Sequence, residues 1–160
     1  MGGRGVEADH LHAIALRKSA CDGNYMSVCN NLAAMYAEGE GIQKDEPRAA
    51  ALYEKACAAD EASACNNLAW MYKGGRGVPK DLKRATELNE KACKLSERRV
   101  GARDETADGC NDLAAMVDAE EAVGTFPDAL ALYKRACIAG SGKACNTIKY
   151  RYGMRPPREP

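Results

Sequence analysis

The chain lacks three features that would point to common classes of partner. Its 23 Lys and Arg residues balance 23 Asp and Glu residues, so no net charge draws it to nucleic acid or to an anionic membrane. No apolar run approaches the roughly eighteen residues of a membrane-spanning helix. No apolar stretch near Met1 resembles a signal peptide. The 160 residues therefore predict one domain with no nucleic-acid partner and no membrane span.

The residue patterns of metal sites and phosphate loops are also missing. The two histidines, His10 and His12, are two positions apart, so on a helix they do not point the same way. The cysteines form no Cys-x2-Cys pair of the kind that is common in structural zinc sites. The segment 74–77 is rich in glycine but lacks the Gly-Lys-Ser/Thr of a phosphate loop. We predict no metal and no cofactor.

What the sequence does contain is a repeated pair of cysteines. The first members of the pairs are 36, 36 and 44 residues apart, and the second members are 36, 45 and 35 residues apart. A period of this length indicates a solenoid of stacked helical hairpins. We predict an all-α, α/α solenoid of about four repeats of 36 residues. The pairs are Cys21 and Cys29, Cys57 and Cys65, Cys93 and Cys110, and Cys137 and Cys145.

Each second cysteine starts a segment with a helical period of apolar residues. In 29–39 and 65–75, Leu, Ala, Met and Tyr lie three, four, six and seven positions after the cysteine. This spacing places them on one face of an amphipathic helix, which we call the A helix of a repeat. A Gly-x-Gly turn, 39–41 or 75–77, is expected to end it, since glycine readily takes the left-handed conformation. Residues 117–127 lack this turn, so the third repeat departs locally from the pattern.

A second helix, the B helix, is expected after each turn. Asp45 and Asp81 stand where a carboxylate can cap its first turn. We expect seven helices: a first B helix at about 8–21, three A/B pairs, and a final A helix at about 144–152. Small residues on the B helices would let neighbouring helices approach closely; they are Ala49, Ala56, Ala85 and Ala92.

The repeat domain is predicted to cover residues 1–153. Residues 2–6 match residues 74–78 two repeats later, so the first repeat is expected to be incomplete. An insertion is expected at about 97–106, where the third cysteine pair is separated by sixteen residues instead of seven. Residues 154–160 are rich in proline and are predicted to form a disordered tail.

In this arrangement each cysteine pair joins the end of a B helix to the start of the next A helix. These positions face each other across a short connection, so a disulfide of ordinary geometry is reachable within each pair. A closed loop of nine residues would add about 2.5 kcal/mol of stability in the chain-entropy model. Free buried thiols remain an alternative. A metal site is a further alternative, although it needs four converging ligands and the cysteine pairs lie one repeat apart.

The repeated motif resembles the Sel1-like repeat over residues 2–152. It reads Leu-Ala-x-Met-Tyr-x-x-Gly-x-Gly-(Val/Ile)-x-Lys-Asp, followed by Ala-x-x-Leu-x-x-Lys-Ala-Cys. The added cysteine pairs are similar to those of the cysteine-rich branch of that family, the secreted Helicobacter cysteine-rich proteins. The resemblance implies an α/α superhelix with one disulfide per repeat and a secreted or periplasmic location. A mitochondrial intermembrane-space assembly factor for cytochrome c oxidase has a similar architecture.

The resemblance also implies a possible activity, because members of that family have been described as binding or hydrolysing β-lactams. A serine β-lactamase needs Ser-x-x-Lys and a partner motif such as Lys-Thr-Gly, and neither is present. A zinc β-lactamase needs several histidine and aspartate ligands, whereas this chain has two histidines. We therefore predict a protein that is not an enzyme. The serines without a lysine three positions on are Ser19, Ser27, Ser63, Ser96 and Ser141.

An asparagine follows the second cysteine in every repeat. Positions one, five and eight after that cysteine share a face of the A helix that the core does not use. By analogy with tetratricopeptide arrays, this face should line the concave surface. Its amides could clamp the main chain of an extended peptide, with two aromatic side chains as anchors. Capping of the A helix, or hydrogen bonds between repeats, are the alternatives. The candidate binding residues are Asn30, Asn66, Asn111, Asn146, Trp70 and Tyr150.

The prediction for function is a monomeric protein-interaction scaffold that binds a protein or an extended peptide. A secreted or periplasmic location follows from the cysteines, which favour an oxidising compartment. A mitochondrial assembly factor and a β-lactam-active protein are the alternatives, and both depend on the resemblance alone.

Overall fold

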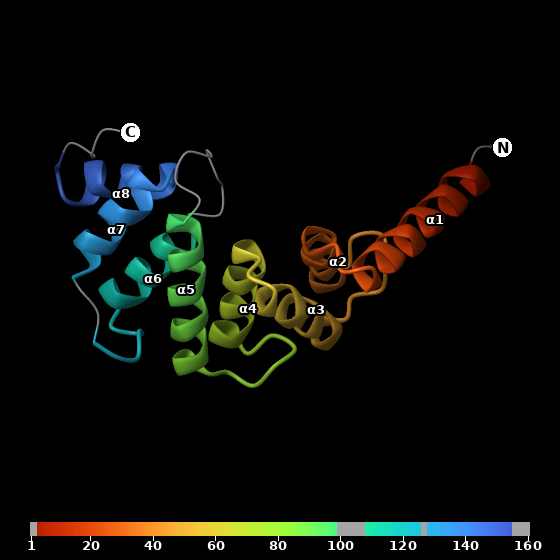
Figure 1. The fold of residues 1–160 in the computed structure, drawn as a ribbon, viewed down its shortest axis with the longest axis horizontal. Helices are drawn as coiled ribbons and strands as arrows, with labels where there is room; N and C mark the ends of the chain where they lie inside the picture. The colour runs from red at the N-terminus through yellow and green to blue at the C-terminus, as the bar shows by residue number, and fades with distance from the viewer. Residues whose placement is uncertain (1–2, 99–107, 126–127, 155–160) are drawn as a thin grey trace.

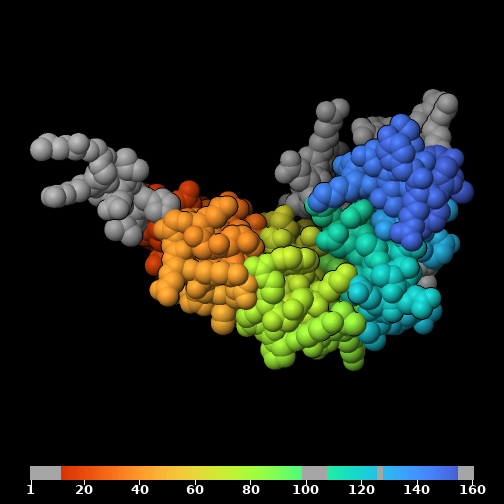
Figure 2. All heavy atoms as spheres, turned by 180° about the vertical axis from the view of Figure 1, so that it is seen from behind, coloured from red at the N-terminus to blue at the C-terminus, as the bar shows by residue number. Residues whose placement is uncertain are grey.

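The computed structural model describes residues 3–98, 108–125 and 128–154, with side chains from residue 12 onward, and these residues form eight α-helices and no strand. The helices follow one another along an arc (Figure 1). The space-filling view from behind shows the same bowed outline (Figure 2). The helices are α1 (Gly3–Asp22), α2 (Met26–Glu38), α3 (Glu46–Ala58), α4 (Ala62–Gly74), α5 (Leu82–Glu97), α6 (Asp108–Asp118), α7 (Ala129–Ile138) and α8 (Gly142–Arg151).

The predicted all-α solenoid is confirmed, and the predicted number of seven helices is wrong. A first B helix, three A/B pairs and a final A helix add up to eight, and that order is the observed one. α1 begins at Gly3 instead of about residue 8. The equivalent segment 74–78 forms a turn because it packs on the preceding repeat: a Cβ on Gly77 would lie 2.3 Å from the carbonyl carbon of Glu46.

Two predicted segments fall largely outside the described residues. Of the insertion expected at about 97–106, the structure describes Glu97, which ends α5, and Arg98. Of the tail expected at 154–160, it describes Met154.

The B helices begin where the sequence places a capping aspartate. The carboxylate of Asp45 accepts a hydrogen bond from the backbone N–H of Arg48 at 3.0 Å, and Asp81 accepts one from Arg84 at 2.9 Å. Asp128 caps α7 in the same way, with 2.8 Å to the N–H of Ala131. These bonds satisfy N–H groups that have no partner within the helix.

The A helices end at a residue in the left-handed conformation. Gly39 (φ 77°) and Gly75 (φ 68°) close α2 and α4, as predicted. In the third repeat, which lacks the Gly-x-Gly turn, Glu120 takes this conformation (φ 57°). The next N–H, of Glu121, returns to the carbonyl of Met116 at 2.8 Å. A non-glycine residue thus closes the third A helix with the same kind of backbone turn.

All four predicted disulfides are present. They link Cys21 to Cys29, Cys57 to Cys65, Cys93 to Cys110 and Cys137 to Cys145, with Cα–Cα distances of 4.7, 4.6, 4.3 and 4.8 Å. Each disulfide joins the last turn of a B helix to the first turn of the next A helix and so spans the connection between them. Neither free thiols nor a cysteine metal site is compatible with this bonding.

Small residues allow the helices to pack closely around the core. The predicted alanines Ala49, Ala56, Ala85 and Ala92 are all fully buried. The buried side chains form two clusters, one from α1 to α5 together with Met116, and one that joins the end of α5 to α6, α7 and α8. The boundary between the clusters lies where α5 packs on α6.

The contacts between A helices bear on the expected placement of these helices along the concave surface. In the described residues α4 contacts α6, and α6 contacts α8, more extensively than α2 contacts α4 or than the B helices α3, α5 and α7 contact one another. In a curved stack the elements on the concave side are the ones that come closest together. The geometry therefore agrees with the expected placement of the A helices along the concave surface. We call this surface the inner face.

Candidate functional site

Trp70 is the most unusual side chain of the inner face. It lies on α4 between Ala69 and Met71, both fully buried, yet 54% of its own surface is exposed. The position five residues after the second cysteine is an alanine in two other repeats, Ala34 and Ala115. A large, half-exposed ring in this row presents an apolar surface of the kind that is enriched at protein interfaces.

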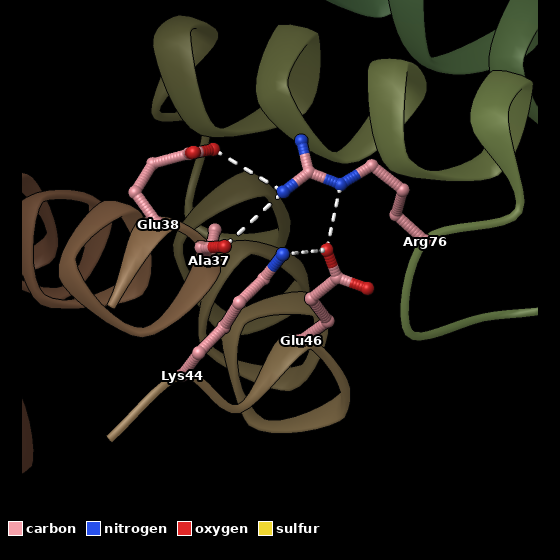
Figure 3. Close-up of polar contacts among 5 residues, drawn as sticks. All are labelled: Ala37, Glu38, Lys44, Glu46 and Arg76. Atoms are coloured by element: carbon pink, nitrogen blue, oxygen red, sulfur yellow. Dashed lines mark hydrogen bonds and ion pairs between the residues drawn. The ribbon is translucent and has the colours of Figure 1, made fainter. Parts of the chain in front are cut away.

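Arg76 holds the ring of Trp70 from the turn that follows α4. Its guanidinium carbon lies 4.3 Å from the centre of the indole ring, within the range of a cation–π contact. The same guanidinium reaches back to the preceding repeat (Figure 3). Its Nε donates to Oε1 of Glu46 at 2.8 Å, and its Nη2 donates to the carbonyl of Ala37 at 3.1 Å and to Oε1 of Glu38 at 3.2 Å.

This cluster fixes both the repeat interface and the tryptophan. Lys44 adds a second cation to the carboxylate of Glu46, with Nζ 3.0 Å from Oε1. The hydrogen bond from Arg76, together with that from Lys44, lowers the pKa of Glu46. Sequence reasoning missed the role of Arg76. The recurrence of Gly-Gly-Arg-Gly at residues 2–5, two repeats earlier, was the available signal.

A pocket of about 240 Å³ opens beside Trp70, between α4, α5 and α6. Asn89 of α5 and Met116 of α6 line it, with Asp112 and Lys73 among the other residues. Asn89 is 4% exposed, and its Nδ2 lies 3.4 Å from the sulfur of Met116. Its Oδ1 is buried and accepts no hydrogen bond from the described residues. Lys73 stands at the eighth position of the predicted face, whereas the other three residues were not predicted to belong to a site.

Asp112 is the partly buried carboxylate of this pocket. Burial raises its pKa, although hydrogen bonds from Asn66 and Asn111 act in the opposite direction. The Nδ2 of Asn111 donates to Oδ1 of Asp112 at 3.2 Å. No cation of the described residues forms an ion pair with Asp112. The nearby Lys73 pairs instead with Glu121, with Nζ 2.7 Å from Oε2.

The predicted asparagine row makes contacts within the protein. The Nδ2 of Asn67 donates to Oδ1 of Asn30 at 3.1 Å, which joins the A helices of two repeats. Asn66 makes the equivalent contact with Asp112 in the next repeat. Helix capping is wrong as an explanation, because Tyr25 and Glu61, not asparagines, occupy the N-cap positions of α2 and α4. Hydrogen bonding between repeats is present for the first two asparagines.

The remaining predicted residues lie toward the C-terminal end of the array. Tyr150 on α8 is 76% exposed, and Nζ of Lys149 lies 5.0 Å from the centre of its ring. Asn146, also on α8, is exposed. Neither residue lines the pocket beside Trp70. The structure thus brings Trp70 and Asp112 together with Asn66 and Asn111 and leaves Asn146 and Tyr150 one repeat away.

One grouping of possible metal ligands occurs among the described residues, and it is already occupied by other bonds. It consists of Cys93, Cys110 and Glu97. The two sulfurs form a disulfide. Glu97 accepts two hydrogen bonds from Arg135, at 2.6 and 3.0 Å. The grouping is therefore a staple beside an ion pair.

Comparison with known proteins agrees with this architecture. Residues 1–25, 27–61, 62–97 and 127–141 match the Sel1 repeat. The chain belongs to the Sel1 repeat family. Two of these matches begin at α2 and α4, so a Sel1 repeat corresponds to one A/B pair. The unmatched stretch 98–126 contains α6 and the turn that departs from the pattern.

Three solved structures have a similar fold. Cysteine rich protein B of Helicobacter pylori is 28% identical, with a TM-score of 0.63, and the alignment covers 91% of this chain and 98% of that one. A protective antigen present in uropathogenic Escherichia coli strains, which displays an SLR fold, is 20% identical with a TM-score of 0.67. A Sel1 repeat protein from Oxalobacter formigenes is 21% identical with a TM-score of 0.63.

The lengths of these proteins differ. The alignments cover 91% and 82% of this chain but 31% of the Escherichia coli antigen and 51% of the Oxalobacter protein. At these identities the two structures show the fold alone. No protein of the curated set matches the chain.

The Sel1 repeat has general consequences for function. Sel1 repeats generally serve as protein-interaction scaffolds, and the fold is typically not catalytic. The four disulfides and the likeness to the Helicobacter protein indicate an extracytoplasmic protein. Among the described residues, no helix is long and apolar enough to cross a membrane.

Proposed function

We propose that this Sel1 repeat protein is a non-catalytic scaffold that binds an extended peptide, or an extended segment of a protein, on its inner face. The observation that carries the proposal is the half-exposed Trp70, which stands beside a pocket at a position that two other repeats fill with alanine. A monomeric scaffold in the periplasm or outside the cell fits the disulfides.

Trp70 suits an anchor because the fold holds it in place. The stacked guanidinium of Arg76 is itself tied to Glu46 and to the carbonyl of Ala37. The ring therefore loses little freedom when a partner covers it. Tryptophan is among the residues that most often dominate binding at protein interfaces.

The asparagine row would act on the main chain of the peptide. A side-chain amide has two N–H donors and an oxygen with two acceptor positions, so one contact between repeats leaves others available. The Oδ1 of Asn66, for example, is buried and accepts no hydrogen bond from the described residues. In this proposal Asn30, Asn66, Asn111 and Asn146 face peptide groups about three residues apart, because packed helices are about 8–10 Å apart and an extended chain spans about 3.5 Å per residue. Tyr150 supplies a second aromatic anchor at the far end.

The test is selection of binders from a displayed library of random peptides, followed by affinity measurements on one synthetic binder. Trp70→Ala should weaken binding at least tenfold, or about 1.4 kcal/mol, without unfolding the protein. Leu16→Ala is the matched control, because Leu16 is equally exposed (58%) but lies on α1, a B helix. Equal affinity of both variants would show that Trp70 is not the anchor.

The same peptide tests the asparagines. Asn66→Ala should weaken binding several-fold if its amide contacts the peptide. If the amide serves only the contact with Asp112, the variant should lose about 1 kcal/mol of folding stability and keep its affinity. Thermal unfolding and titration calorimetry on the same samples separate the two results.

A further inference from the structure

We propose that the pocket beside Trp70 selects a positively charged side chain, a lysine or an arginine, in the peptide that the inner face binds. This inference rests on the proposed function and adds the chemical class of the partner. It depends on three properties of the pocket: how it arises, which polar atoms line it, and how its charges are paired.

The pocket exists because an asparagine replaces a tyrosine. Four positions before the last cysteine of the B helix, α3 carries Tyr53 and α7 carries Tyr133, and both rings are buried. The equivalent residue of α5 is Asn89, also buried. The smaller side chain leaves space between α4 and α6, and the pocket lies in that space. The boundary between the two core clusters falls at the same place.

The free polar atoms that line the pocket are acceptors. The Oδ1 of Asn89 is buried and accepts no hydrogen bond from the described residues. The carboxylate of Asp112 also lines the pocket, and its bonds in the described residues come from the neutral amides of Asn66 and Asn111. An unsatisfied buried acceptor costs free energy that a ligand with N–H donors would recover. Ammonium and guanidinium groups carry donors only.

The charges at the pocket favour a cation over an anion. Lys73 lines it, but its amine is 2.7 Å from Glu121, so its charge is already paired. Asp112 has no ion-pair partner among the described residues, since the nearby Lys143 binds Asp108 at 3.0 Å. An anionic ligand would have to break the Lys73–Glu121 pair and approach Asp112. A cationic ligand would supply the counter-charge that Asp112 lacks.

The size of the pocket fits one side chain. At about 240 Å³ it is smaller than the sites of about 300–1,000 Å³ that enclose whole small molecules. Trp70 stands at its edge, and its ring can cover the alkyl chain of a lysine or stack on a guanidinium. The pocket is therefore suited to a side chain whose main chain lies on the inner face.

The first experiment uses a probe of the side chain alone. Trp70 is the single tryptophan of the chain, so its fluorescence and its indole NMR signal report on the pocket directly. Titration with butylguanidinium chloride should shift both signals at millimolar concentration. Butylurea, which is neutral and of similar shape, should bind at least tenfold more weakly. Equal responses to the two probes would overturn the inference.

Two variants keep the fold and change the pocket. Asp112→Asn introduces the residue present at the equivalent positions Asn31 and Asn67. It should reduce the preference for butylguanidinium over butylurea at least fivefold. Asn89→Tyr introduces the tyrosine found at this position in α3 and α7. It should fill the pocket and abolish the response to both probes. Wild-type affinity for butylguanidinium in both variants would place the probe elsewhere on the protein.

The second experiment separates this inference from the proposed function. Peptides selected on the wild-type protein should contain a lysine or arginine whose replacement by glutamine costs at least tenfold in affinity, and this loss should largely disappear in Asp112→Asn. Peptides that bind through Trp70 without any basic residue would overturn the cation pocket and leave the scaffold function intact. Failure to select any peptide that depends on Trp70 would count against both.

Discussion

The B helices end differently at the two kinds of connection. The first half of the chain has two regular hairpin connections, and the middle has a long one. At the regular connections a residue in the left-handed conformation, Asn24 or Asp60, closes the B helix three positions after its cysteine. Gly140 does so at the last connection. In the third repeat α5 continues for four residues beyond Cys93, to Glu97. At the long connection, therefore, Ser96, which is equivalent to Asn24 and Asp60, belongs to the helix instead of to a turn.

This change also altered the contact between successive repeats. The Nζ of Lys55 donates to the carbonyl of Cys21 at 2.8 Å, and Lys91 donates to the carbonyl of Cys57 at 2.7 Å. Arg135 is the next residue at this position, but α5 continues past the carbonyl of Cys93. Arg135 therefore binds the carboxylate of Glu97 instead of that carbonyl. A side-chain ion pair has taken the place of a contact to the backbone.

The candidate binding features lie where the last fully regular repeat meets the irregular part of the chain. The match to the Sel1 repeat is interrupted over residues 98–126, and the core divides at the same place. Asn89 of α5 lies on one side of this division and Asp112 of α6 lies on the other, and both line the pocket. Regular repeats maintain the solenoid, and the pocket lies where the regularity ends; in the proposed function this is the place where a side chain of the partner binds.

The largest expected difference between the two regions concerns the disulfides. Cys93→Ser/Cys110→Ser should lower the free energy of unfolding by about 3 kcal/mol, and Cys57→Ser/Cys65→Ser by about 2.5 kcal/mol. The reason is that the third bridge closes a loop with a sequence separation of 17, against 8 for the second, and so restricts the unfolded chain more. Chemical denaturation of both double variants measures the difference.

The two disulfides are well matched for this purpose, because all four sulfur atoms belong to buried residues. The lost packing should therefore be similar in both variants. A larger loss for the regular bridge would mean that the long connection stores no entropic advantage, and that the regular repeats depend more on their staples.

The second prediction compares the two kinds of contact between repeats. Lys55→Met should cost about 1 kcal/mol, because it removes a charged hydrogen bond to the backbone carbonyl of Cys21. Lys91 is not suited to this comparison, because its Nζ also lies 2.9 Å from Oδ1 of Asp60. Arg135→Met should cost about 0.5 kcal/mol, since both members of the Arg135–Glu97 pair are more than one-third exposed. Added salt should increase the difference between the stability losses of the two variants. At about 1 M NaCl the Arg135 effect should approach zero, whereas most of the Lys55 effect should remain. The reverse salt dependence would contradict this distinction.

The repeat architecture could be predicted from the sequence because several local signals agree. The cysteine period, the Leu-Ala-x-Met-Tyr stripe and the aspartate caps each specify the same hairpin, so the pairing of all eight cysteines followed from the repeat. The start of α1 was predicted five residues late. Its Gly-rich segment resembles a turn, but the equivalent turn at 74–78 depends on contacts with a preceding repeat.

The site was predictable only in part, because it depends on differences between repeats and not on what they share. Trp70 was visible as a departure from Ala34 and Ala115. Asn89 was equally visible as a departure from Tyr53 and Tyr133, but its importance depends on the space that it leaves between helices. The contacts of Asn30 and Asn66 with the next repeat required the register of neighbouring A helices, which a period alone does not fix.

The smallest expected effect concerns the charge of Asp112, which the regular repeats replace with asparagine. Burial raises its pKa, so the folded state binds the proton of this carboxyl more tightly than the unfolded state does. Its contribution to stability is therefore present at low pH and is lost as the pH rises from the ordinary carboxyl value through the raised one. Asp112→Asn should be slightly more stable than the wild type at pH 7. The gain should vanish below about pH 4, where the Asp112 carboxyl is protonated in both the folded and the unfolded state. Urea denaturation of the two proteins across this range measures the difference. A variant that is less stable at pH 7 would show that the carboxylate is satisfied in the folded state, and the third repeat would then carry no electrostatic cost at its pocket.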